Sequence, residues 1–71
     1  MNNIDEFHQA AINVAHKHGY KPTEVIIYSV KKAGVRLTHA ATAKVSGDES
    51  ASFESALESF ENKLKEYHGK S

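Results

Sequence analysis

Apolar residues recur at two different spacings along this chain, and the change of spacing divides it into four predicted elements. Near both ends they return every three or four residues, which predicts helices with one apolar face. Between residues 25 and 45 they are first consecutive and then strictly alternating, which predicts two β-strands. The predicted order is therefore helix, strand, strand, helix.

The first helix is predicted over residues 3–18. Asn3 can cap its first turn, and Glu6 three residues later completes a capping-box pattern. Gly19 and Pro22 are typical of a helix end and of the chain just beyond it. The apolar row consists of Ile4, Phe7, Ala11, Val14 and Ala15, with His18 completing it.

The middle of the chain, residues 23–47, is predicted to form a β-hairpin. Its first half is rich in β-branched and aromatic residues, and its second half alternates from Val35 to Val45. An all-α fold is the alternative, because Pro22 could begin a helix that ends with the charged turn and glycine at residues 31–34. The strict alternation favours the hairpin.

A four-residue loop at residues 31–34 sets the predicted strand register, because a slip of one residue would turn every side chain to the other face. The predicted pairs are Val30 with Val35, Tyr28 with Leu37 and Ile26 with His39. The face expected to be structural holds Ile26, Tyr28, Val30, Val35, Leu37, Ala41, Ala43 and Val45. The face expected to be open holds Val25, Ile27, Ser29, Arg36, Thr38, Ala40, Thr42 and Lys44.

The last helix is predicted to begin after Ser52, a natural N-cap, and to end at Gly69. Its apolar stripe is Phe53, Ala56, Leu57, Phe60, Leu64 and Tyr67. The chain is thus predicted to be an α+β protein of αββα order, with both helices packed on one face of an antiparallel ribbon. A lone ribbon has two free edges, and a homodimer in which two hairpins join into a four-stranded sheet is an arrangement that would remove one edge from each.

The length of 71 residues predicts one domain spanning residues 1–71. The chain has no cysteine, which excludes disulfides, thiolate metal sites and a thiol nucleophile. Its start carries acids where a signal peptide has basic residues, and no stretch has the roughly 20 apolar residues of a membrane span. We therefore expect a soluble cytoplasmic protein without membrane association.

Charge is balanced overall but uneven along the chain. The formal net charge is zero, yet residues 17–44 contain six basic residues and one acidic residue. The basic hairpin is the feature with most functional weight, because a charged two-stranded ribbon could contact phosphates or a protein partner. The candidate binding residues are Lys31, Lys32, Arg36, Thr38, Thr42 and Lys44.

Catalytic chemistry has no positive signal in the sequence. No two of the five histidines stand three or four residues apart, the spacing that places two metal ligands on one helix face. His39 is expected to pack at the apolar face, with a pH-sensitive interface as the alternative. No serine occupies a nucleophile elbow, and the glycines form no phosphate loop. We therefore expect no enzyme activity, no cofactor and no metal.

Two functions follow from these features. The first is a small non-enzymatic binding protein that acts by protein–protein contact through the hairpin edge or its open face. In size and outline the chain is similar to small accessory proteins of phages and mobile elements, which act by binding a host protein. The second is nucleic-acid binding through Lys31, Lys32, Arg36 and Lys44.

Overall fold

Two helices and one β-hairpin make up the computed structural model of the protein, which describes residues 3–69. In chain order the elements are α1 (Ile4–His16), the 3₁₀ turn η1 (Pro22–Glu24), β1 (Ile26–Lys32), β2 (Val35–Ala41) and α2 (Phe53–Gly69). The predicted αββα order is confirmed, and the all-α alternative is wrong. Where that alternative placed a helix start, the chain makes only the single turn η1 before extending into β1.

Helix α1 begins as its capping box predicts. The side chain of Asn3 accepts a hydrogen bond from the backbone N–H of Glu6 at 2.9 Å, and its amide donates to the Glu6 carboxylate at 3.4 Å. The helix ends at His16, two residues before the predicted end. Gly19 follows with a φ of +87°, a left-handed conformation that glycine adopts without steric cost.

The turn between β1 and β2 contains two residues, not the predicted four. Ala33 and Gly34 have φ values of +51° and +79°, the positive pair that characterises a type I′ hairpin turn. Lys32 therefore pairs with Val35, and every predicted pair is wrong by two residues. A shift of two keeps the same side chains on the same face, so the predicted grouping into two faces holds for residues 26–41. It is wrong for residues 42–45, which leave the strand in the reversal after β2, and Val45 lies in the core. An alanine in a left-handed conformation is uncommon, which is why the sequence did not indicate this turn.

The outer edge of β2 is covered by the segment that follows it. The backbone N–H groups of Thr38 and Ser50 donate to each other's carbonyl oxygens at 2.9 and 3.0 Å, and Gly47 N–H donates to the carbonyl of Ala40 at 2.9 Å. The strand ends at Ala41, four residues before the predicted end, because the chain reverses over residues 42–45. The hydroxyl of Thr42 fixes this reversal by accepting a hydrogen bond from Val45 N–H at 3.1 Å.

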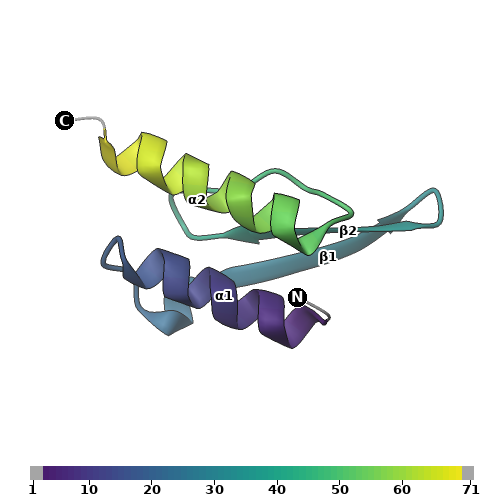
Figure 1. The fold of residues 1–71 in the computed structure, drawn as a ribbon, viewed down its shortest axis with the longest axis horizontal. Helices are drawn as coiled ribbons and strands as arrows, with labels where there is room; N and C mark the ends of the chain where they lie inside the picture. Colours follow the sequence, from purple (N-terminus) through teal and green to yellow (C-terminus); the bar gives the residue numbers. More distant parts are fainter. Residues whose placement is uncertain (1–2, 70–71) are drawn as a thin grey trace.

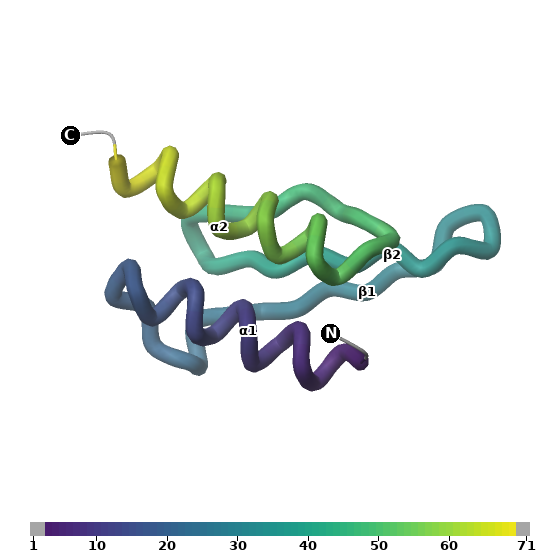
Figure 2. The backbone as a smooth tube through the Cα atoms, in the orientation of Figure 1, coloured from purple at the N-terminus to yellow at the C-terminus, as the bar shows by residue number. Residues whose placement is uncertain are grey.

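Both helices pack on the same side of the hairpin, and the hairpin tip extends beyond them (Figures 1 and 2). Phe7 of α1 stacks on Phe53 of α2 with ring centroids 5.4 Å apart. Phe60 and Leu64 of α2 are fully buried, as the predicted stripe requires. The core consists of Phe7, Ala11, Val14, Ala15, Tyr20, Val25, Ala40, Val45, Ala56, Phe60 and Leu64.

Gly47 allows helix α2 to lie directly against the segment beside β2. A Cβ atom at this position would lie 3.0 Å from both the backbone nitrogen and the Cα atom of Phe60. Such contacts are tighter than those of nearly all real Cβ atoms, so a larger residue here would push α2 away. Gly47 is therefore a packing residue and not merely the end of the hairpin.

Candidate binding site on the hairpin

The two faces of the hairpin are buried to very different degrees, and the prediction of which face is structural is wrong. Val25 and Ala40, predicted on the open face, are 6% and 0% exposed. Tyr28 and Val30, predicted on the structural face, are 45% and 42% exposed. The small side chains of β2 explain the reversal: Ala40 lets the bulky residues of α2 approach the strand closely, which larger side chains would prevent.

We call the exposed side of the hairpin the bare face. It consists of Ile26, Tyr28, Val30, Val35, Leu37 and His39. Register places Tyr28 beside His39 and Val30 beside Leu37. The rings of Tyr28 and His39 stack with centroids 4.8 Å apart and planes 14° from parallel. Exposed apolar residues that stand singly are ordinary, but this group is contiguous, which is typical of an interaction surface.

The charge on the side of the bare face belongs to Lys32, which lies beside Val35 at the tip end. Lys32, at the tip end of β1, forms an ion pair with Glu49 at 3.4 Å, and Glu49 belongs to the segment beside β2. This ion pair links β1 to the segment on the other side of β2, and it neutralises the charge of Lys32, one of the candidate binding residues. The His39 ring adds one polar group, and its Nδ1 atom is buried without a hydrogen-bond partner among the described residues. A complementary surface would therefore be apolar and close to neutral.

The predicted binding residues are only partly brought together. Lys31 and Arg36 lie opposite each other next to the hairpin turn, where both are exposed. Arg36 also donates a hydrogen bond to the hydroxyl of Ser29 at 3.2 Å. Thr38 and Thr42 are 2% and 8% exposed, so their predicted place on an open face is wrong. Thr38 lies on the side of β2 that the helices cover, as Ala40 does, and Thr42 lies in the reversal that follows the strand.

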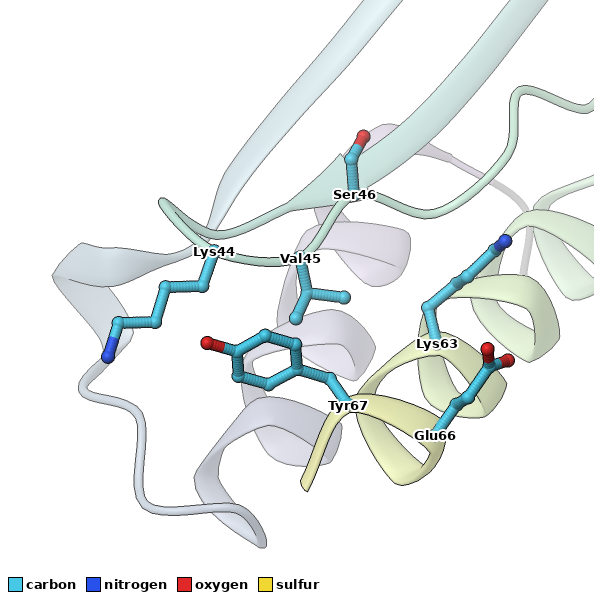
Figure 3. Close-up of a pocket in the computed structure, with 6 residues that line it drawn as sticks. All are labelled: Lys44, Val45, Ser46, Lys63, Glu66 and Tyr67. Atoms are coloured by element: carbon cyan, nitrogen blue, oxygen red, sulfur yellow. The ribbon is translucent and has the colours of Figure 1, made fainter. Parts of the chain in front are cut away.

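Lys44 lies at the opposite end of the hairpin, in the reversal after β2. It borders a hollow of about 210 Å³ between that reversal and the end of α2, where Tyr67 lies against Val45 (Figure 3). Lys63 and Glu66 line the other side, so the hollow has no dominant charge. Lys44 therefore cannot act together with the lysines at the tip on one small ligand.

A cluster of aromatic side chains near the end of α2 was not predicted. The hydroxyl of Tyr20 is 2.9 Å from Nε2 of His68, and the His68 ring stacks on His18 with centroids 5.5 Å apart. These contacts connect the end of α2 to the loop that follows α1. The sequence gave no signal for them, because residues 20 and 68 are joined only by the fold.

The other ionisable groups of the described residues form no metal-binding cluster. Within residues 3–69 no three histidine, aspartate or glutamate side chains are arranged to hold a metal ion. A hydrogen bond with its own backbone N–H lowers the pKa of Glu54, in the first turn of α2, and the Ser52 side chain adds to this effect. A carboxylate in the first turn of a helix is ordinary capping chemistry.

Comparison of the chain with known protein families, with curated proteins and with solved structures found no match. Among the described residues no helix has both the length and the apolar character needed to cross a membrane. The candidate site is the bare face, because its apolar side chains are exposed and contiguous.

Proposed function

We propose that this protein is a non-enzymatic binding protein that acts by contact with another protein through the bare face. The observation that carries the proposal is that Ile26, Tyr28, Val30 and Val35 are 42–48% exposed and adjacent on one side of the hairpin. Contiguous exposed apolar patches of this kind are often functional.

The architecture supports a partner on this face. A β-ribbon usually needs a covering layer on an apolar face, and both helices lie on the other side. Burying an exposed aromatic and its aliphatic neighbours is the kind of contact that dominates protein interfaces. Tyr28, stacked on His39, is the expected anchor because its ring is already held in place.

The test compares two tyrosines of nearly equal exposure. Tyr28 is 45% exposed on the bare face, and Tyr67 is 46% exposed on α2. Proteins captured from an extract of the native host would be compared for wild type, Tyr28→Ser and Tyr67→Ser, and a captured partner would then be purified and its affinity measured. We expect Tyr28→Ser to weaken binding at least about tenfold, as loss of an interface anchor does, and Tyr67→Ser to leave it unchanged. Equal binding by all three proteins would contradict the proposal.

Nucleic-acid binding is the second candidate, because Lys31 and Arg36 stand side by side at the protruding hairpin tip. Fluorescence anisotropy with labelled duplex DNA and RNA at low salt would compare Lys31→Ala/Arg36→Ala with Lys63→Ala/Lys65→Ala, which removes the same charge from α2. Salt-sensitive binding that only the tip variant loses would support this function. The absence of binding by wild type at low salt would remove it.

A further inference from the structure

The two edges of the hairpin differ as much as its two faces. The outer edge of β2 is paired with residues 47–50 through the backbone hydrogen bonds described above. The outer edge of β1 has no such partner in the described part of the chain. Six of the seven β1 residues are exposed, and only Ile27 is partly buried. An unpaired strand edge is a ready template for another strand.

The pairing pattern shows which backbone groups this free edge presents. Thr38 directs its N–H and C=O away from β1, towards Ser50. Ser29 lies opposite Thr38, and in an antiparallel ladder the two members of such a pair both point their backbone groups outwards. Ile27 and Lys31, two residues away on either side, share this orientation. The intervening residues of β1 bond to β2.

We propose that two copies of the chain pair antiparallel through β1, around a two-fold axis at Ser29. The outward backbone groups of Ile27, Ser29 and Lys31 of one copy would bond to those of Lys31, Ser29 and Ile27 of the other. This register has the greatest overlap, because Ser29 is the central residue of β1. The two hairpins then form one continuous four-stranded antiparallel sheet.

Charge along β1 identifies a second copy as the occupant. The segment has an acid, Glu24, just before its start and two lysines, Lys31 and Lys32, at its end. In the register around Ser29, Lys31 and Lys32 of one copy lie opposite Ile27 and Ile26 of the other, so no like charges are directly opposite, and Glu24 lies two residues beyond Ile26 towards these lysines. The net charge of the chain is zero, so whole copies do not repel each other.

The pairing would use both the part of β1 that projects beyond the helices and the part that lies beside them. The hairpin tip extends past both helices, so the tip half of each β1 would lie beside the helix-covered half of the other copy (Figure 2). The pairing also places the two bare faces side by side on one surface, with Tyr28 opposite Val30 of the other copy. Together the two bare faces form a larger continuous apolar surface than one copy presents.

Backbone amide hydrogen exchange followed by NMR at two protein concentrations tests the pairing without any mutation. We expect exchange at Ile27, Ser29 and Lys31 to slow about tenfold when nine-tenths of the protein is dimeric, because only the monomer exposes these amides. The amides of Tyr28 and Val30 bond to β2 in both states, so their exchange should not depend on concentration. Exchange that is independent of concentration at all five amides would overturn the proposal.

Sedimentation equilibrium adds a matched set of variants. Wild type should reach twice the monomer mass of 7.8 kDa, and so should Ser29→Ala, which keeps the backbone N–H. Ser29→Pro removes that outward donor without removing a bond to β2, and it should remain monomeric. A wild-type monomer at high micromolar concentration would overturn the proposal. A dimer that survives Ser29→Pro but is lost in Tyr28→Ser would also overturn it, because association would then use the bare face.

The edge and the bare face are separate surfaces, so the two proposals fail separately. The exchange pattern at Ile27, Ser29 and Lys31 reports only on the edge. Tyr28 also lies opposite Val30 of the other copy in the proposed dimer, so partner binding by Tyr28→Ser is measured at a protein concentration where wild type is monomeric, and it then reports on the face.

Discussion

The covered and bare faces of the hairpin are built from the same two strands and show how little the hydrophobicity of a strand face determines its burial. The bare face carries the larger apolar side chains, among them Ile26, Tyr28 and Val30, yet each of these is more than two-fifths exposed. The covered face, which is the opposite side of the same strands, contributes the small Ala40 and Thr38, which are 0% and 2% exposed. Complementarity with the helices, and not side-chain hydrophobicity, selected the covered face.

The largest difference between the faces should appear when the helix that covers one of them is truncated. Phe60 is fully buried in α2, within the same core as Ala40. Phe60→Ala should cost about 3–5 kcal/mol in the free energy of unfolding, as much as the whole stability of a small domain. Urea denaturation would measure this. A cost below about 1 kcal/mol would mean that α2 does not cover the hairpin as described.

The contact between α2 and the segment beside β2 should be the next most sensitive feature. Gly47→Ala places a Cβ atom 3.0 Å from the Phe60 backbone and should destabilise the protein by about 1–3 kcal/mol. Gly69→Ala is the matched control, because a Cβ there meets nothing within 4 Å. Thermal unfolding of the two variants should therefore separate clearly. Equal melting temperatures would contradict the close approach at Gly47.

Changing valine to threonine at one buried and one exposed position tests directly whether the two sides differ in burial. Val25→Thr buries a hydroxyl at a position that is 6% exposed and should cost about 1–3 kcal/mol. Val30→Thr makes the same change at a position that is 42% exposed and should cost less than about 0.5 kcal/mol. Chemical denaturation below the concentration of any dimer would measure both. Similar costs would mean that the bare face is buried in the free protein.

The two-residue turn sets which side chains meet on the bare face, and substitutions at Ala33 test its conformation. Ala33 has a φ of +51° in the type I′ turn, where asparagine is favoured before glycine. Ala33→Asn should stabilise the hairpin by about 0.5–1 kcal/mol, and the β-branched Ala33→Val should destabilise it. Opposite signs in thermal unfolding are the expected result. Stabilisation by valine would favour a longer loop and a different register.

Local patterns were sufficient for the elements themselves. The three- and four-residue spacing around Phe7 and Phe60 located both helices, and Asn3 and Ser52 located their starts, where their side chains accept hydrogen bonds from Glu6 and Ser55 N–H. Alternation located the strands and grouped their residues into two faces. These features depend on neighbours within a few residues, which a single sequence contains.

The candidate site was harder to predict, because the bare face is simply the side of the hairpin that no other described element covers. Thr38 and Thr42 look like surface residues on an alternating strand, but α2 and the reversal at residues 42–45 enclose them. Lys44 was grouped with the tip lysines although the reversal carries it to the other end of the hairpin. No signal in the sequence shows where a later segment will fold back, so these residues were misplaced together.

The sequence alone determined the order of helices and strands and, for residues 26–41, the membership of each hairpin face, because periodicity and capping act over a few residues. Only the tertiary structure decided which face the helices cover, that residues 47–50 close one edge while β1 keeps the other free, and that Tyr28 and its neighbours remain exposed. Those outcomes depend on how side-chain volumes fit between segments far apart in the chain, as Gly47 fits against Phe60, and such fits are set by packing in three dimensions.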